Sequence, residues 1–168
     1  FLFLARLIVP QMIPNVTGVL VAGGKSRRMG RDKRFLELGG QALLQRALSV
    51  LQSLFDEVLV ALAEPLPQLT GQGYRVVTDL IPNCAALGGL YTGLSSASHS
   101  RVLAVGCDMP FLNPAVLRRL AELGAQADVV IPKLATGLQP MLAVYSKTCL
   151  PHLERMVRAQ QFKVQGLT

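Results

Sequence analysis

The chain has 168 residues, which is enough for one domain with a substantial hydrophobic core and too few for two. Hydrophobic residues make up 51% of the chain and charged residues 16%, which excludes intrinsic disorder, and no apolar stretch reaches the ~20 residues of a membrane span. The formal net charge of +7 favours an anionic partner, which could be a nucleic acid, an anionic membrane surface or a small anionic substrate.

The first half of the chain alternates short apolar segments with a helical pattern. Apolar residues recur at spacings of three and four over residues 42–55, which predicts an amphipathic helix after a turn at Gly39 and Gly40. Residues 64–73 contain prolines and glycines and predict a surface connection. The predicted strands lie at residues 16–22, 35–38, 57–62 and 74–79.

The second half continues the alternation. The small residues of segment 87–94 predict the start of a helix that packs closely on the sheet. Asn113 and Pro114 predict the beginning of a further helix, which ends at Gly124. We expect the apolar face of that helix to consist of Val116, Leu117, Leu120 and Leu123. Further strands are predicted at residues 101–108, 128–132 and 141–145, and a last helix at 151–160.

This alternation predicts an α/β fold of three layers, with a Rossmann-like, mainly parallel sheet and helices on both faces. We expect a single domain over residues 16–168, preceded by an N-terminal extension at 1–15, of which residues 1–11 lie upstream of a native start at Met12. In such a fold, ligands bind outside the carboxyl ends of the strands.

A glycine-rich basic segment follows the first predicted strand. Gly23 and Gly24 end the apolar run, and residues 25–33 contain five Lys or Arg residues. Glycines allow backbone N–H groups to approach an anion, and the cations balance its charge, so the segment is typical of a phosphate-binding loop. It matches neither the common ATP-binding loop nor the dinucleotide fingerprint. A glycine pair alone could also be a simple turn.

Two aspartates follow predicted strands and therefore face the same edge of the sheet as this loop. Asp79 ends the strand at 74–79, and Asp108 ends the strand at 101–108. Carboxylates beside a phosphate-binding loop favour a site for Mg²⁺ and a nucleotide, because Mg²⁺ takes hard oxygen ligands. Taken alone, Asp108 could instead cap a turn before Pro110.

The remaining chemistry-bearing residues favour no second kind of site. The three cysteines form no Cys-x-x-Cys pair, which is typical of a reducing compartment, and we expect a cytoplasmic protein without a disulfide framework or zinc site. Six of the 17 cations lie within residues 25–34, so the charge indicates a small anionic substrate more than a nucleic acid. His99 and His152 are expected at the surface.

Residues 20–33 resemble the signature loop of nucleotidyltransferases that activate a phosphorylated metabolite with a nucleoside triphosphate. The Ala-Gly-Gly form of this loop is similar to that of the molybdenum cofactor guanylyltransferases, and the resemblance covers residues 16–165. It implies transfer of GMP from GTP to the terminal phosphate of molybdopterin, with release of pyrophosphate and with Mg²⁺ as cofactor. It also implies GTP and molybdopterin as partners, together with proteins that deliver or accept the cofactor, and neither nucleic acid nor membrane.

The resemblance also implies roles for individual residues. Catalytic roles fall on Lys33, Arg28 and Asp108, with Asp108 as the Mg²⁺ ligand through a Cys-Asp-x-Pro-Phe pattern at 107–111. The implied nucleotide-binding residues are Leu20, Val21, Ala22, Gly23, Gly24, Gly30, Lys33, Asp79, Leu87, Gly88, Gly89 and Asp108.

The sequence departs from the family pattern in three places. Asn83 and Ala85 stand where glycines are expected, Ala86 stands for a proline, and Ala61 lies near the position of an asparagine. A C-terminal strand with an Asn-x-Asn-Thr-Pro-like segment is expected to be missing. Two alternatives therefore stay open: another nucleotidyltransferase of this fold, such as a cytidylyltransferase, and a GTP-binding relative without catalysis.

Overall fold

The computed structural model describes residues 11–23, 33–69, 71 and 73–161, and six of its strands form one mixed sheet. The order across the sheet is β5-β4-β1-β6-β10-β7. The first four of these run parallel, whereas β10 is antiparallel to both of its neighbours. The strands are β1 (Val16–Val21), β4 (Val58–Leu62), β5 (Arg75–Thr78), β6 (Arg101–Gly106), β7 (Val129–Val130) and β10 (Leu142–Ser146).

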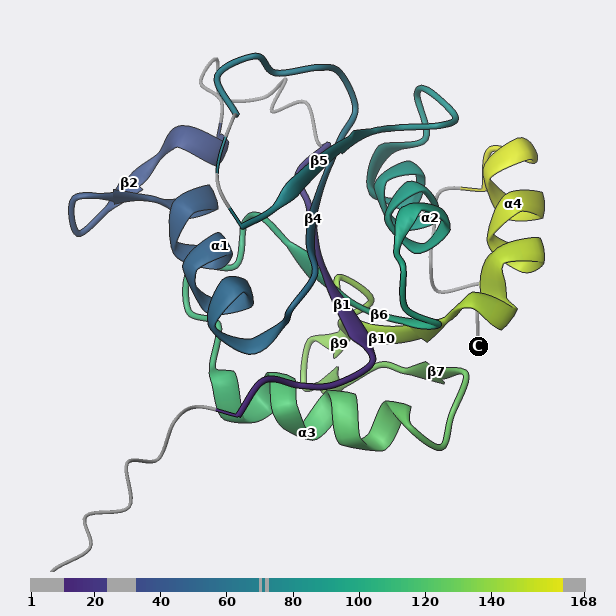
Figure 1. Cartoon of the computed structure of the whole chain (residues 1–168). Coiled ribbons are helices and arrows are strands. Elements are labelled where there is room, and N and C mark those ends of the chain that lie inside the picture. The colour runs from purple at the N-terminus through teal and green to yellow at the C-terminus, as the bar shows by residue number, and fades with distance from the viewer. Residues whose placement is uncertain (1–10, 24–32, 70, 72, 162–168) are drawn as a thin grey trace, which may run out of the picture.

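Helices cover both faces of the sheet, as Figure 1 shows. On one face, α1 (Leu43–Leu54) and α3 (Pro114–Gly124) share a hydrophobic core with the sheet, and on the other face α2 (Ala85–Ser96) and α4 (Leu150–Arg158) do so. Every residue of β1 and β4 is buried, because neighbouring side chains alternate between the two cores. The predicted three-layer α/β fold with a mainly parallel sheet is therefore confirmed.

Small residues let α2 approach β1 closely, as predicted. A Cβ atom added to Gly93 would lie 2.5 Å from Cγ1 of Val19, and one added to Gly89 would lie 2.8 Å from Cγ1 of Val21. The helix begins at Ala85, two residues before the predicted segment.

The structure confirms how α3 begins and corrects which of its faces is buried. The Asn113 side chain accepts a hydrogen bond from the Ala115 N–H, and Pro114 occupies the first turn. Leu117 and Leu120 are buried as expected, but Val116 and Leu123 are 43% and 44% exposed. The prediction was wrong for these two because residues 117, 120, 121 and 124 form the stripe that faces the sheet.

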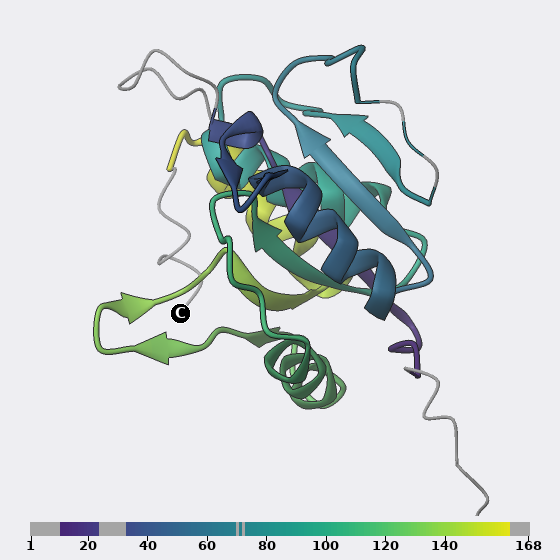
Figure 2. The same ribbon diagram turned by 90° about the vertical axis from the view of Figure 1, so that its left-hand side faces the viewer.

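Two small hairpins also differ from the sequence prediction. The strand predicted at 35–38 is a short 3-10 helix, η1 (Lys33–Phe35), followed by β2 (Glu37–Leu38), which pairs with β3 (Gln41–Ala42). Gly39 and Gly40 form the turn between them with positive φ angles of 63° and 77°. A second hairpin, β8 (Lys133–Leu134) and β9 (Gly137–Leu138), was not predicted and projects from the body of the molecule (Figure 2).

Residues just before β1 are part of the packed structure. Ile13 is 8% exposed, and its N–H donates to the Leu54 carbonyl at the end of α1, 2.7 Å away. The rest of the segment expected as an extension, residues 1–10, lies outside the described residues. None of the helices in the described parts of the chain is long and apolar enough to cross a bilayer.

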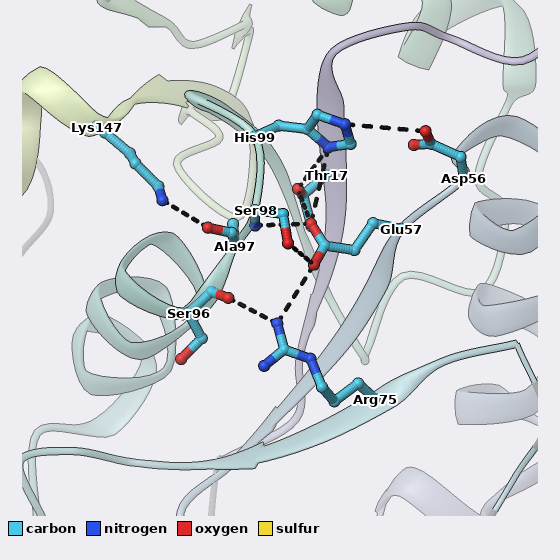
Figure 3. A network of polar contacts seen from close by, with 9 residues as sticks. All are labelled: Thr17, Asp56, Glu57, Arg75, Ser96, Ala97, Ser98, His99 and Lys147. Carbon is cyan, nitrogen blue, oxygen red and sulfur yellow. Dashed lines mark hydrogen bonds and ion pairs between the residues drawn. The ribbon is translucent and has the colours of Figure 1, made fainter.

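A polar cluster connects the amino ends of the strands around Glu57 (Figure 3). The Glu57 carboxylate accepts hydrogen bonds from the Thr17 hydroxyl, from the Ser98 N–H and hydroxyl, and from Arg75. Burial acts to raise the pKa of Glu57, but these hydrogen bonds outweigh it and lower the pKa to about 2. His99, expected at the surface, is partly exposed and joins this cluster with a ring nitrogen 3.1 Å from Thr17 Oγ1.

Candidate functional site

The candidate site lies at the carboxyl edge of the sheet, where the strand order reverses between β1 and β6. Such a reversal leaves a crevice outside the strand ends, because the chain connections on its two sides run in opposite directions. Backbone hydrogen bonds continue between the strands at this edge: the Ala22 N–H donates to the Ala61 carbonyl, and the Cys107 N–H donates to the Val21 carbonyl. This edge brings together the segments that carry Gly23, Asp79 and Asp108.

The signature loop is described only at its two ends. Leu20, Val21 and Ala22 are almost completely buried, and their predicted roles in nucleotide binding stay predictions. Lys33 begins η1, and its side chain, like Gly24, Arg28 and Gly30, lies outside the described residues. The predicted roles of these four residues stay predictions.

Arg34 links the far end of the loop to its beginning. Its Nη1 donates to the Ala22 carbonyl, 3.2 Å away. Sequence reasoning counted Arg34 only as one of the clustered cations. Its structural contact could not be read from the sequence, because it joins two residues twelve positions apart that no local pattern connects.

Asp79 occupies a narrow space beside three glycines. Its Oδ2 lies 3.6 Å from the position of a Cβ atom added to Gly23 and 3.1 Å from one added to Gly88, and its Oδ1 lies 3.8 Å from one added to Gly89. A side chain at Gly88 would crowd the carboxylate, whereas a Cβ atom at Gly23 or Gly89 would only touch it. The sequence predicted that these residues belong to one site, and the structure brings them together.

The Asp79 carboxylate is poorly compensated. Its Oδ1 is buried and has no hydrogen-bond partner among the described residues. Burial raises the pKa of Asp79 to about 6, because the charged form loses solvation. A buried acceptor without a partner is uncommon in folded proteins, and at a strand end it marks a place where a ligand donor can bind.

Leu87 does not share this environment. Its side chain is fully buried in the core between α2 and the sheet, and its predicted role in nucleotide binding stays a prediction. Gly88 and Gly89 belong to the first turns of α2, whose N-terminal end favours negative charge.

Asp108 is exposed and stands two residues after β6. Its Oδ1 would lie 2.9 Å from a Cβ atom added to Gly106, and the Met109 N–H donates to the Gly106 carbonyl in a tight turn. The turn presents the carboxylate to solvent at the same sheet edge as Gly23.

The donors at this edge fit Mg²⁺ by their chemistry. Within the described residues, no group of three or more His, Cys, Asp or Glu side chains is placed to hold a metal ion. Mg²⁺ needs no such cage, because it keeps several waters and takes one or two carboxylates together with substrate phosphates. An exposed carboxylate such as Asp108, at the same sheet edge as Gly23, is a suitable donor of this kind.

The segment between Asp79 and α2 departs from the family pattern and carries backbone strain. Asn83 and Ala85 have positive φ angles of 63° and 49°. These are the two positions where the resemblance to the family led us to expect glycine. The backbone therefore keeps a conformation suited to glycine, which an alanine side chain makes unfavourable.

Thr92 is a second contact that sequence reasoning missed. Its hydroxyl accepts a hydrogen bond from the Leu80 N–H at 2.9 Å, directly after Asp79. The sequence signal that could have indicated this contact is the polar Thr92 among the small and apolar residues of the predicted helix.

Comparison with known proteins agrees with this arrangement. Residues 18–166 match the family model described as the MobA-like NTP transferase domain. The chain belongs to this family. The resemblance inferred from residues 20–33 is thereby confirmed.

Relatives of known name and structure support the assignment. The chain is 41% identical to a protein of Pelotomaculum thermopropionicum named "Probable molybdenum cofactor guanylyltransferase", over 89% of this chain and 73% of that protein. It is 37% identical to the "Molybdenum cofactor guanylyltransferase" of Desulfosudis oleivorans, over 90% and 76%. The crystal structure of "Molybdopterin-guanine dinucleotide biosynthesis protein A" from Archaeoglobus fulgidus has the same fold, with a TM-score of 0.77 at 23% identity, over 89% of this chain and 76% of that chain.

Proposed function

We propose that the protein transfers GMP from GTP to the terminal phosphate of molybdopterin, which yields the guanine dinucleotide form of the cofactor and pyrophosphate. The names of the relatives support the reaction and both substrates. The observation that carries the proposal is the Asp79 carboxylate, whose buried Oδ1 has no hydrogen-bond partner among the described residues and lies beside Gly89, while its Oδ2 lies beside Gly23 and Gly88.

In this proposal the nucleoside binds between the first glycines of the loop and the start of α2. Asp79 accepts hydrogen bonds from the nucleoside, and the N1–H and exocyclic amine of guanine are donors of the right kind. The triphosphate follows the loop, where backbone N–H groups at Gly23 and Gly24 and the side chains of Arg28 and Lys33 bind its oxygens.

The transfer is a substitution at the α-phosphorus. An oxygen of the molybdopterin phosphate forms a bond to this phosphorus, while the bond to the bridging oxygen of the β-phosphate breaks and pyrophosphate leaves. A phosphate monoester is ionised at neutral pH, so no protein group has to remove a proton. The protein contributes positioning and charge neutralisation, and Lys33 and Arg28 stabilise the negative charge that collects on the departing pyrophosphate.

Asp108 is the proposed ligand for Mg²⁺. When bound, Mg²⁺ neutralises phosphate oxygens and polarises the α-phosphoryl group. Asp108 holds its carboxylate on an exposed turn, which leaves space for phosphate oxygens and water on the same ion.

A pyrophosphate-release assay tests the proposal. The protein is incubated with Mg²⁺, molybdopterin and GTP, CTP, ATP or UTP in separate reactions. We expect release with GTP only. Release with CTP only would show a cytidylyltransferase, and GTP binding without release in a chain that spans the whole length of the relatives would show a binding protein without catalysis.

A further inference from the structure

Thr92 is an unusual residue for its position in the fold. Among the described residues, the buried polar side chains are those of Thr17, Thr92 and Ser146. Thr92 has no exposed surface and lies in α2, which is otherwise packed on the sheet by leucines and glycines. Its hydroxyl therefore has to use a hydrogen-bonding partner inside the protein.

That partner is the backbone immediately after Asp79. The Leu80 N–H donates to Thr92 Oγ1 at 2.9 Å, and the Asp79 N–H donates to the Leu62 carbonyl at 2.8 Å. Two successive N–H groups are thus held from opposite sides, one by the end of β4 and the other by α2.

Hydrophobic contacts hold the segment further along the chain, where Ile81 packs against the core and Cys84 is buried in it, but they do not involve Leu80. The Leu80 side chain is 59% exposed, and the chain after it passes through the strained positions Asn83 and Ala85. The Asp79 carboxylate itself gains little from its environment, because burial disfavours its charged form and its Oδ1 has no partner among the described residues. The two backbone hydrogen bonds are the direct polar contacts that hold the backbone on either side of the Asp79 carbonyl.

We propose that Thr92 is a positioning residue for the nucleotide, which holds the Asp79–Leu80 peptide so that the carboxylate faces the space beside Gly23, Gly88 and Gly89. The inference rests on the proposed function, since it assumes that Asp79 binds GTP. Without the hydroxyl, the Leu80 N–H loses its acceptor inside the protein, and the segment spends part of its time displaced. If only about a tenth of the molecules keep the binding geometry, the apparent affinity for GTP falls about tenfold.

The variants Thr92→Val and Thr92→Ser separate the hydroxyl from the shape of the side chain. Valine keeps the volume and branching of threonine but cannot accept a hydrogen bond, whereas serine keeps the hydroxyl. Thr17→Val is the matched control, because Thr17 is also fully buried and loses the same hydroxyl at the opposite end of the sheet, in the Glu57 cluster.

The first measurement needs no ligand. Amide hydrogen exchange in the free protein should show slow exchange at Leu80 in the wild type, in T92S and in T17V, and faster exchange at Leu80 in T92V. Equally slow exchange in T92V would overturn the anchoring role. If T92V does not fold, the wild type alone still decides, because rapid exchange at Leu80 would show that the N–H is not held.

The second measurement uses GTP with Mg²⁺. We expect the dissociation constant and KM for GTP to rise about tenfold in T92V, with kcat nearly unchanged, because the interaction is made equally in the ground state and the transition state. T92S should restore the wild-type values, and T17V should lose thermal stability without a change in KM. An unchanged affinity in T92V, together with faster exchange at Leu80, would overturn the positioning role. If the wild type binds no GTP, the proposed function fails, and the exchange result still shows whether Thr92 anchors the segment.

Discussion

At the scale of single residues, the site depends on one carboxylate that the fold does not stabilise. The buried Oδ1 of Asp79 lacks a partner among the described residues, and its pKa is raised to about 6 by burial. A group that weakens the free protein and is placed beside three glycines is typical of a binding residue, whose interactions are completed by the ligand.

Replacing Asp79 by asparagine should weaken GTP binding and stabilise the free protein. The neutral amide removes a charge whose burial is costly at neutral pH, so we expect the free energy of unfolding at pH 7.5 to rise by about 1–2 kcal/mol. The dissociation constant for GTP should rise at least about tenfold, because charged hydrogen-bond acceptors are lost. Calorimetry and thermal melting measure both effects, and Glu122→Gln, on an exposed acid of α3, is the control.

The affinity for GTP should depend on pH through the same group. Because the pKa of Asp79 in the folded protein is about 6, the carboxylate becomes protonated and stops accepting hydrogen bonds as the pH falls through 6. We expect the dissociation constant for GTP to rise from pH 7.5 to pH 5, and this dependence to be much weaker in D79N. The same pH dependence in both proteins would assign the titration to another group.

Asp108→Ala and Lys33→Ala should each lower the turnover by about 10²–10⁴-fold while the fold survives. Asp108 is exposed and outside the core, so its loss should leave the melting temperature nearly unchanged. Steady-state kinetics and circular dichroism together test these roles, and a variant with the wild-type rate would remove that residue from the mechanism.

At the scale of secondary-structure elements, α2 combines glycines that allow close packing with an alanine that is strained. Its glycines must approach β1 and leave space for Asp79, whereas its first residue, Ala85, has a φ angle of 49°. Strain at the start of this helix lies only six residues from Asp79, so the connection between β5 and α2 is the part of the site where sequence and backbone fit each other least well.

Ala85→Gly should therefore stabilise the protein by about 0.5–1 kcal/mol, because glycine adopts this backbone conformation without a steric penalty. Ala86→Gly is the matched control. It lies one residue further into the helix without a positive φ angle, and it should destabilise the protein by about 1 kcal/mol. Urea unfolding of both variants measures the effect, and equal destabilisation by both would show that Ala85 is not strained.

At the scale of the whole molecule, each end of the sheet carries a carboxylate, and the two differ in how many hydrogen bonds they accept. The carboxyl ends hold Asp79, whose Oδ1 has no partner among the described residues, and the amino ends hold Glu57, whose carboxylate accepts hydrogen bonds from β1, β5 and Ser98, just after α2 (Figure 3). The hydrogen bonds of Glu57 thus stabilise the amino ends of the strands, whereas Asp79 at the carboxyl ends keeps an oxygen that a ligand can bind.

Glu57 should contribute to stability above pH 4.5 and lose that contribution in acid. Its pKa is about 2 in the folded protein against an ordinary 4.5, so the folded state favours the ionised form, and the gain disappears as the pH falls from about 4.5 towards 2. Glu57→Gln should lower the free energy of unfolding by about 1–3 kcal/mol at pH 7 and by much less at pH 2.5. Urea unfolding at both pH values decides, and an equal loss at both would exclude the carboxylate charge as the cause.

The sequence determined the alternation of strands and helices and placed Gly23, Asp79 and Asp108 at strand ends, because these features depend on local periodicity and on glycine and proline signals. The prediction that Val116 and Leu123 are buried was wrong, because periodicity identifies the apolar residues of a helix but not which of them the sheet covers. It could not show the hairpin of β8 and β9, whose strands are only two residues long.

Only the tertiary structure decided the strand order, the burial of Asp79 and its attachment through Thr92. These depend on contacts between residues far apart along the chain, such as the meeting of Gly23, from the end of β1, with Gly88 and Gly89 at the start of α2 around one carboxylate. The residue types at a strand end predict a nucleotide site. The elements that pack against a carboxylate there decide whether it is exposed or buried and whether it has a hydrogen-bond partner.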